Sequence, residues 1–386
     1  MFNFTALPPL SLYIHIPWCV RKCPYCDFNS HEGKNTVPEK QYVAALIADL
    51  DQELPQIWGR QLHSLFIGGG TPSLFSAEAI DELLCAVRAR LPFSFDTEVT
   101  LEANPGTVEA HKFQEFRAAG INRLSIGVQS FNDDALQRIG RIHGRQEAIR
   151  AAELAHDAGF DNVNLDLMFG LPKQSLQQAL EDINTAIALE PTHLSHYQLT
   201  LEPNTPFHHQ PPTLPEDELR WTMQERCQET LADADFSHYE VSAYARPGKQ
   251  CHHNLNYWQF GDYIGIGAGA HGKISNAQFQ TITRHAKQRH PQEYLQHANN
   301  ERRASRREAL SPKEAGFEFM LNALRLKEGF ASSLFTTHTG LPITIIESAL
   351  RQAEEQALIE WSATHIRPTQ KGWDYLNNLQ QLFLPE

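Results

Sequence analysis

The sequence has no long apolar run and no dense set of cysteines. Its six cysteines are three clustered and three scattered, at Cys85, Cys227 and Cys251. A secreted disulfide framework would be denser and more even. No window reaches the ~18 uninterrupted apolar residues of a membrane span, and residues 1–10 lack the features of a secretory signal. These absences predict a cytoplasmic protein with reduced thiols.

Positive charge is also scarce. Lys and Arg number 33 against 46 Asp and Glu, which gives a formal net charge of −13. Nucleic-acid-binding proteins usually present a basic face, so this balance argues against a nucleic-acid partner. With 386 residues and 41% hydrophobic content, the chain is long enough for one large domain and a smaller one.

Short apolar runs alternate with amphipathic stretches over the first two-thirds of the sequence. The expected strands are 12–16, 64–68, 98–103, 123–128, 163–169 and 193–201. The expected helices between them are 39–54, 76–90, 108–119, 145–158 and 174–189. Repeated strand–helix units predict a parallel sheet with right-handed crossovers. Six units predict an α/β fold with a partial (β/α)6 barrel rather than a closed eight-fold one.

The segments after the sixth unit are less regular. The proline-rich residues 203–217 predict a loop, and a helix is expected over 216–233. Segments 239–244 and 262–267 are expected to extend the sheet. The glycine-rich run 265–272 mimics a dinucleotide fingerprint, but no convincing helix follows it, so it predicts a tight strand end.

The pattern changes again near residue 301. Helices are expected at 312–326, 343–355 and 370–382, with a short ribbon at 358–367. The sequence therefore predicts a barrel domain with a sheet extension over 1–300, and a mainly helical, winged-helix-like domain over 301–386. Many winged helices bind DNA, but this one lacks a dense basic recognition helix, which favours a packing or docking role.

Three cysteines, Cys19, Cys23 and Cys26, follow the first expected strand with the spacing Cys-x3-Cys-x2-Cys. Structural four-iron clusters use four thiolates, whereas three thiolates leave one iron open for a ligand that is not protein. The loop after a barrel strand is also where barrel active sites form. Structural zinc completed by His15 or His31 is the alternative.

Polar residues interrupt three strands near their C-terminal ends, at Glu102, Gln129 and Asp166. Because buried acids and amides need partners, they form either a polar network inside the barrel or a site for a sugar, amine or carboxylate. Arg141, in the loop after the fourth strand, is able to pair with a carboxylate. The run 68–70 of three glycines is either a turn or a place where backbone N–H groups approach a ligand.

The pattern Tyr-x-His-Ile-Pro-x-Cys-x3-Cys-x2-Cys, from Tyr13 to Cys26, resembles the radical S-adenosylmethionine (SAM) superfamily. More narrowly, most of the chain resembles the oxygen-independent coproporphyrinogen III oxidase family. The resemblance implies a [4Fe-4S] cluster on the three cysteines, SAM on the open iron, an electron donor, and cleavage of SAM to a deoxyadenosyl radical. It also implies SAM contacts at Tyr13, Tyr25, Gly69, Gly70, Thr71, Glu102, Gln129, Arg141 and Asp166.

Two departures separate the branches of this family. In the oxidase branch that the chain resembles, the motif is Cys-x3-Cys-x2-Cys-x-Cys, and an N-terminal extension precedes it. Here Phe28 stands two residues after Cys26, and only eighteen residues precede Cys19. Both departures resemble the heme chaperone branch, which binds heme and passes it to acceptor heme proteins. Membrane-bound acceptors, which the resemblance implies, would add peripheral membrane association to the expected cytoplasmic location.

The segment Cys251–Trp258 resembles the His-Asn-x-x-Tyr-Trp motif of that branch. A lone histidine beside aromatic residues is more often a satisfied core residue, but imidazole is a good heme ligand and aromatic rings flank porphyrin faces. The motif favours His253 as the axial heme ligand, with His252 and Cys251 in reserve. The hypothesis is a SAM- and cluster-binding heme chaperone. The alternatives are a radical SAM oxidoreductase acting on a tetrapyrrole and a zinc-stabilised scaffold.

Overall fold

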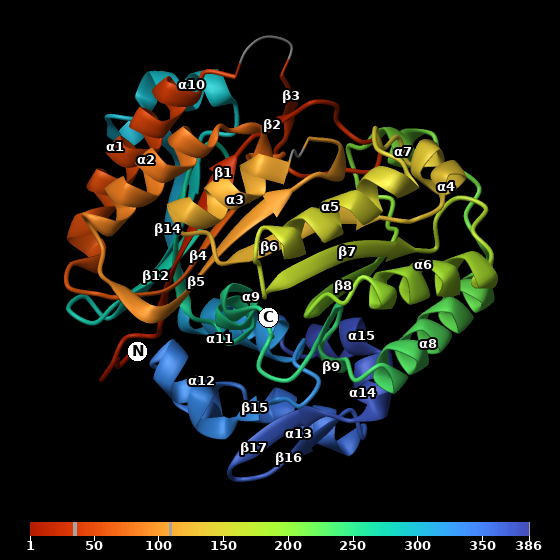
Figure 1. Ribbon diagram of the computed structural model, residues 1–386. Coiled ribbons are helices and arrows are strands. Elements are labelled where there is room, and N and C mark those ends of the chain that lie inside the picture. Colours follow the sequence, from red (N-terminus) through yellow and green to blue (C-terminus); the bar gives the residue numbers. More distant parts are fainter. Residues whose placement is uncertain (34–36, 108–109, 386) are drawn as a thin grey trace.

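Six parallel strands form the centre of the protein, as the sequence predicts (Figure 1). The computed structural model describes residues 1–33, 37–107 and 110–385. The six strands pair in chain order as a partial barrel. They are β1 (Leu10–Ile16), β4 (Leu62–Gly69), β5 (Phe93–Ala103), β6 (Arg123–Gln129), β7 (Val163–Phe169) and β8 (His193–Gln198).

Helices cover the outer face of these strands (Figure 1). Two of them begin at serine caps, because Ser76 and Ser175 accept hydrogen bonds from the backbone N–H three residues later. Residues 108–109 of the expected helix 108–119 lie outside the described residues. The helices are α1 (Glu39–Ile57), α2 (Ala77–Arg88), α3 (Ala110–Ala119), α5 (Arg145–Asp157) and α6 (Leu176–Ala188), with a short α4 (Asp133–Arg138) that the sequence analysis did not predict.

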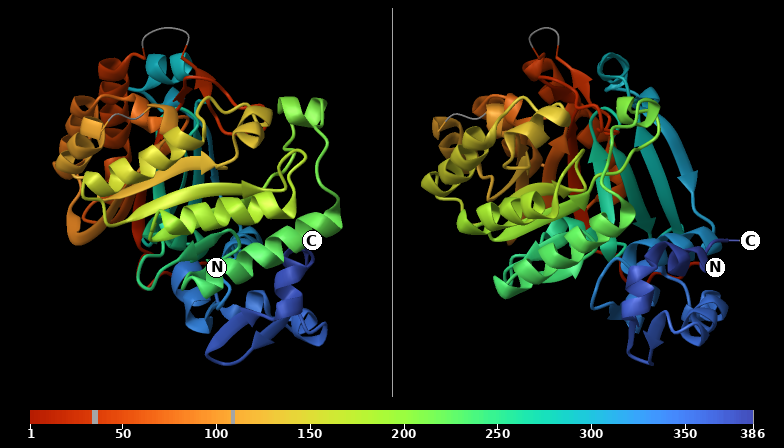
Figure 2. Two further views of the ribbon diagram at one scale, coloured as in Figure 1. Left: turned by 45° about the vertical axis from the view of Figure 1, so that its right-hand side comes forward. Right: turned by 90° about the vertical axis from the view of Figure 1, so that its right-hand side faces the viewer.

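The sheet continues past the barrel on both sides, to twelve strands in all (Figure 2). Antiparallel β10 (Ala243–Ala245) and β9 (Ser237–Glu240) follow β8. Beside β1 lie β11 (Asp262–Ile266), β12 (His271–Asn276), β13 (Thr281–Lys287) and β14 (Ala304–Ala309). The glycine-rich run therefore forms the turn from β11 to β12. The expected loop 203–217 contains the short helix α7 (Pro206–His209) and leads into α8 (Asp217–Asp233).

The C-terminal region combines helices with a three-stranded sheet. The chain start joins it, because Phe2 and Phe4 belong to the same hydrophobic cluster as Phe319 and Leu350. The domain boundary between residues 300 and 301 stays a prediction. Strand β14 (Ala304–Ala309), which follows that boundary, belongs to the large sheet. The elements are α11 (Pro312–Ala323), β15 (Phe330–Ala331), α12 (Ser332–Thr339), α13 (Glu347–Glu355), β16 (Ile359–Trp361), β17 (His365–Pro368), α14 (Gln370–Asp374) and α15 (Leu376–Gln381).

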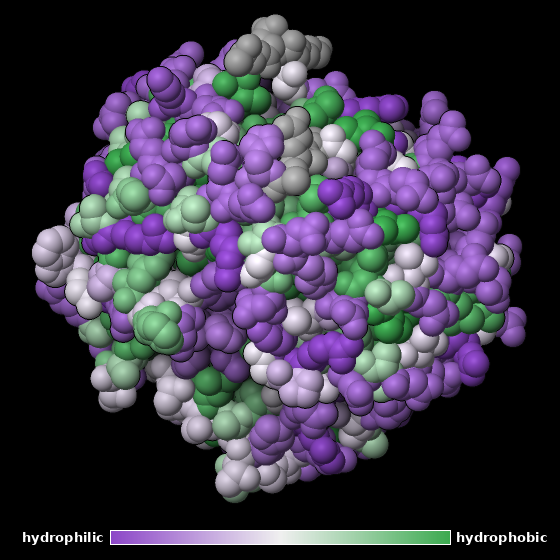
Figure 3. Space-filling model, in the orientation of Figure 1, coloured by the Kyte–Doolittle hydropathy of each residue, from purple (hydrophilic) through white to green (hydrophobic). Residues whose placement is uncertain are grey.

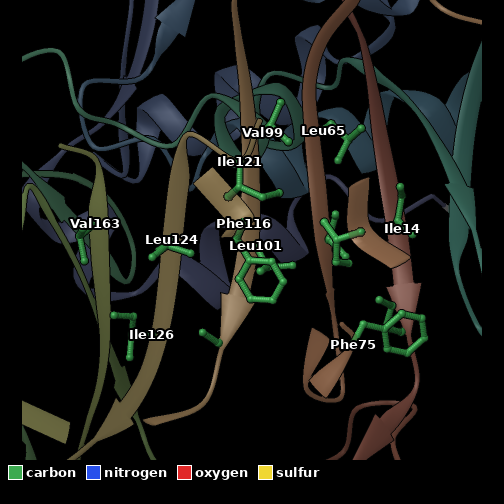
Figure 4. Packing of buried hydrophobic residues seen from close by; sticks show 14 of the residues in the cluster. Ile14, Leu65, Phe75, Val99, Leu101, Phe116, Ile121, Leu124, Ile126 and Val163 are labelled. Carbon is green, nitrogen blue, oxygen red and sulfur yellow. The ribbon is translucent and has the colours of Figure 1, made fainter. Parts of the chain in front are cut away.

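The main core lies between the barrel strands and their outer helices. Ile14, Leu65, Leu101 and Ile126 are fully buried there (Figure 4). Because successive side chains of a strand point to opposite faces, the residues next to them point to the inner face. That alternation places Tyr13, Glu102 and other polar side chains on the inner face of the barrel.

A buried ion cluster joins the sheet extension to α1. Lys287 Nζ lies 2.5 Å from Asp49 Oδ1 and 2.7 Å from Glu53 Oε1. The guanidinium of Arg303 contacts the same two carboxylates, at 2.8 Å and 2.9 Å. Burial alone would raise the pKa of Glu53, but Lys287, His285 and Arg303 outweigh it and lower that pKa to about 2. Glu53 is therefore ionised at neutral pH, and the ion pairs hold β13 against α1.

The face of the molecule seen in Figure 3 carries mostly hydrophilic side chains, with apolar areas between them. In the described part of the chain, no helix combines the length and apolar character needed to cross a membrane.

Candidate cofactor site

The cysteine loop between β1 and α1 is held by hydrogen bonds of its own. Asn29 Nδ2 donates to the carbonyls of Ala268 and Arg289, each at 2.9 Å. His15 Nε2 lies 2.8 Å from Asn29 O, and Lys22 Nζ donates to Phe28 O at 2.9 Å. The turn after β11 and the segment after β13 thus anchor the loop. The paired short strands β2 (Trp18–Cys19) and β3 (His31–Glu32) also stabilise it.

All three loop cysteines are partly exposed free thiols on one cavity of about 520 Å³. In the described residues, no three His, Cys, Asp or Glu side chains are grouped so as to hold one metal ion. Burial raises the pKa of both Cys19 and Cys26. The cavity is also lined by His253 and by all the residues at which the resemblance implies SAM contacts: Tyr13, Tyr25, Gly69, Gly70, Thr71, Glu102, Gln129, Arg141 and Asp166.

Two buried carboxyl groups share the inner wall of this cavity. Glu102 Oε2 accepts a hydrogen bond from Gly69 N at 2.9 Å. Burial raises the pKa of Glu102 to about 8, and the nearby Asp166 adds to that rise. Asp166 accepts from Asn164 Nδ2 at 2.8 Å, and burial raises its pKa as well. Carboxyl groups whose pKa is raised by burial in a cavity are typical of functional sites, and a cationic ligand would favour their ionised forms.

Two guanidiniums lie beside these acids. Arg141 Nη2 donates to Asn104 Oδ1 at 2.7 Å, and Arg141 Nη1 lies 3.7 Å from Cys23 Sγ. Arg123, at the start of β6, is 3.9 Å from Glu98. The Nε atoms of both arginines are buried and make no hydrogen bond with any residue that the structure describes. Arg141 is therefore part of the cavity wall, and both arginines present N–H groups that suit an anionic ligand group.

The glycine run packs against β1 instead of opening its N–H groups to the cavity. A Cβ on Gly69 would lie 2.6 Å from the His15 ring, and one on Gly70 would lie 2.5 Å from Trp18 O. The N–H of Gly69 donates to Glu102, that of Gly70 to Ile16 O, and that of Thr71 to Trp18 O. The glycines are therefore required by close packing, and their N–H groups are already used.

Gln129 and the two tyrosines complete the predicted set. Gln129 has a φ of 70°, at a register shift between β6 and β7. For a residue other than glycine this left-handed conformation is strained, and such strain concentrates at functional sites. Tyr13 OH lies 2.9 Å from His15 Nδ1. Burial raises the pKa of Tyr25, which packs on the small apolar cluster of Leu136.

Sequence reasoning missed Arg123 and Asn164, which also line the cavity. Both precede a predicted residue on the same strand by an even number of positions. Arg123 is six residues before Gln129, and Asn164 two before Asp166. Side chains two apart share one strand face, so the strand period was a signal that could have found Asn164. The register shift before Gln129 weakens the same argument for Arg123.

Comparison with known proteins places this geometry in a family. Residues 13–186 match the model of the Radical SAM superfamily, and residues 310–375 match that of the HemN C-terminal domain. A relative from Escherichia coli K12 named heme chaperone HemW is 52% identical, covering 98% of this chain and 99% of its own. A relative of the same name from Haemophilus influenzae is 49% identical over the same shares.

The chain belongs to the HemW family. Its radical SAM match implies a [4Fe-4S] cluster and SAM as the cofactors of the superfamily. The solved structure of coproporphyrinogen III oxidase (HemN) from E. coli has a TM-score of 0.82 to this HemW-family chain, at 23% identity. It covers 98% of this chain and 90% of its own. This likeness confirms the expected fold.

The motif around His253 in this HemW-family chain forms α9 (His252–Trp258), a helix that the sequence analysis did not predict. His253 is 1% exposed. Its Nδ1 lies 2.9 Å from Ser64 Oγ, and its Nε2 lies 2.9 Å from Tyr257 OH. Heme ligation by His253 stays a prediction, and it would require the ring to give up one of these two hydrogen bonds.

The reserve ligands His252 and Cys251 lie outside the cavity lining. The His252 ring stacks on that of His63, with centroids 5.6 Å apart. Cys251 is buried, with Sγ 3.5 Å from Glu98 Oε1. The same Glu98 oxygen accepts the backbone N–H of His253 at 3.2 Å. Glu98 thus fixes the start of α9 from the barrel.

Proposed function

We propose that this protein binds heme and transfers it to acceptor heme proteins in the cytoplasm or at a membrane surface. The observation that carries this proposal is the full-length similarity to relatives named heme chaperones, at 52% and 49% identity. Phe28 stands at the position where the oxidases of the family carry a fourth cysteine, which supports assignment to the heme chaperone branch.

The cofactors of the superfamily fit the cavity. Cys19, Cys23 and Cys26 supply three soft thiolate donors of the kind that iron–sulfur clusters use. When bound, the cluster supplies an electron and an open iron to SAM. The guanidiniums of Arg141 and Arg123, whose Nε atoms make no hydrogen bond with the described residues, suit the carboxylate of SAM.

The remaining cavity residues would orient SAM and exclude water. Glu102 and Asp166, buried acids with raised pKa values, suit its positive charge. Tyr13, Tyr25 and Gln129 line the same cavity, as do Gly69, Gly70 and Thr71. An electron donor would have to dock near the cysteine loop, where the three thiols are partly exposed.

A second candidate function is oxidation of a tetrapyrrole by SAM radical chemistry. The observation that favours it is the complete inner cavity, in which the three cysteines and the ionisable residues expected for SAM all face the same space. A carrier with no SAM chemistry would have no evident need for two buried acids with raised pKa values in this cavity.

Heme binding and transfer should separate the two functions. We expect the cluster-reconstituted protein to bind hemin with a shift of the Soret band and to deliver it to an apo-acceptor. With coproporphyrinogen III and SAM under reducing, anaerobic conditions, we expect no steady formation of protoporphyrinogen. The measurements are absorbance titration, stopped-flow transfer and product analysis.

The control for transfer is the concentration of the acceptor. If the protein hands heme over by contact, the transfer rate rises with acceptor concentration, whereas simple dissociation gives a rate independent of it. Steady turnover of coproporphyrinogen III without hemin binding would establish the oxidoreductase and refute the carrier.

A further inference from the structure

A second cavity of about 680 Å³ lies next to the first, on the inner face of the sheet extension. Its walls include Tyr263 of β11, Lys273 of β12, Arg284 of β13 and Arg306 of β14. Figure 2 shows these strands continuing the barrel sheet beyond β1. The two cavities share six residues, among them Tyr13, Glu102 and Tyr257, so they adjoin. Its volume falls in the range of ~300–1,000 Å³ typical of small-molecule sites.

Aromatic and cationic side chains dominate this second cavity. Phe28, which is 61% exposed, lies on both cavities, and Tyr257, Trp258 and Tyr263 add further rings. Exposed aromatic surface in a cavity favours a flat apolar ligand.

Three arginines, Arg284, Arg289 and Arg306, give the cavity its positive charge. Arg284 is committed to Glu318. Arg306 pairs with the partly exposed Glu308 at 2.7 Å, a pair that solvent weakens. Within the described ranges Arg289 forms no ion pair. The guanidinium of Arg289 is therefore free to pair with a ligand, and that of Arg306 is held only by a weak surface ion pair. Two such guanidiniums suit a ligand with two carboxylates.

Of the residues that the structure describes, three histidines line the two cavities, and one of them has a ring free of hydrogen bonds. Both ring nitrogens of His15 are hydrogen-bonded, to Tyr13 and Asn29. Both of His253 are bonded as well, to Ser64 and Tyr257. His271, the first residue of β12, is exposed, and its ring makes no hydrogen bond with the described residues. Partial burial, followed by the positive charges of Arg284, Arg289 and Arg306, lowers the pKa of His271, and all four residues line this second cavity.

We propose that heme occupies this second cavity, with His271 as a ligand of its iron and with Arg289 and Arg306 binding its two propionates. The assignment rests on the proposed heme-binding function. It fits the charge, the aromatic walls and the one available imidazole, and it places the porphyrin edge next to the SAM cavity. Because Nε2 or Nδ1 of a neutral imidazole binds heme iron readily, His271 needs no rearrangement to serve.

His271→Ala should still bind hemin through the arginines and aromatic walls, but should lose the spectrum of the histidine-ligated iron. Added imidazole should restore that spectrum, which a merely structural role of His271 would not allow. His209→Ala, at an exposed histidine outside both cavities, is the matched control and should match wild type. The measurements are absorbance and electron paramagnetic resonance of the hemin complexes.

Arg289→Gln should weaken hemin binding about tenfold, which corresponds to ~1.4 kcal/mol, because one charge-assisted bond is lost. The dimethyl ester of hemin, which has no free propionate, should bind wild type and Arg289→Gln equally. Arg307→Gln is the matched control, because Arg307 is next to Arg306 on β14 but lines neither cavity.

The outcomes are distinguishable. If wild type binds no hemin, the proposed function itself fails. If wild type binds hemin and His271→Ala keeps the full histidine-ligated spectrum, the assignment of His271 is wrong. If His253→Ala loses that spectrum and His271→Ala keeps it, the axial ligand of the heme iron is His253 on α9 and not His271.

Discussion

Cys23→Ala should leave the protein folded but without the iron–sulfur cluster proposed for its loop. The loop conformation depends on hydrogen bonds from Asn29, Lys22 and His15 rather than on the thiols. Two remaining thiolates are too few to hold a four-iron cluster stably. We expect complete loss of iron and sulfide, with the thermal midpoint of the metal-free protein unchanged within a few degrees.

Cys85→Ala is the matched control, because Cys85 is an exposed free thiol on α2. It should retain wild-type iron and sulfide after the same anaerobic reconstitution. Stoichiometric zinc without sulfide in the wild type would contradict the cluster and support the zinc-stabilised scaffold instead.

The barrel could be predicted because its signals are local. Alternating apolar strands and amphipathic helices appear directly in the sequence, and β7 (Val163–Phe169) matches its expected range at both ends. The parallel order then follows from the crossover rule. The expected site residues meet for the same reason, since the C-terminal ends of parallel strands lie at one edge of the barrel.

The sheet extension and α9 depend on contacts between distant segments. Most of α9 consists of residues with weak helix propensity, and its first turn is fixed by Glu98, more than 150 residues earlier in the chain. Strand β13 is held by Lys287, whose partners Asp49 and Glu53 are on α1. No window of the sequence contains both members of these pairs.

The state of individual groups was also beyond sequence reasoning. The glycine run reads as a place of close approach, but only the structure shows that His15 and Trp18 are the neighbours that approach it. Likewise the motif suggests a ligand at His253, whereas the structure shows both of its ring nitrogens hydrogen-bonded. Whether a ring nitrogen has a hydrogen-bond partner depends on which side chains pack beside it in the folded protein, and the sequence alone does not contain that information.

Glu102→Gln should stabilise the fold and weaken SAM binding at the same time. Burial raises the pKa of Glu102 to about 8, so at pH 7 the folded protein keeps it mostly protonated, whereas the unfolded chain ionises it. Its contribution to stability is therefore complete below the unfolded pKa, near ~4.5, and is lost as the pH rises to about 8. Because the side chain faces the open cavity, we expect a cost at pH 7 on the order of 2 kcal/mol.

Glutamine avoids this cost and keeps an oxygen for the Gly69 N–H. The gain in the free energy of unfolding should be near zero at pH ~4 and largest above pH ~8. Denaturant titration at the two pH values measures it. Glu115→Gln, on the exposed face of α3, is the control and should change stability by less than ~0.5 kcal/mol.

SAM binding should respond in the opposite direction, because SAM is a cation and requires the ionised carboxylate. Wild-type affinity for SAM should rise with pH and level off above pH ~8, since protonation of Glu102 competes with the ligand. Glu102→Gln should bind SAM about ten- to a hundredfold more weakly, with that pH dependence gone. Calorimetry on cluster-reconstituted protein measures both. A variant that loses stability but keeps SAM affinity would instead make Glu102 part of a structural polar network inside the barrel.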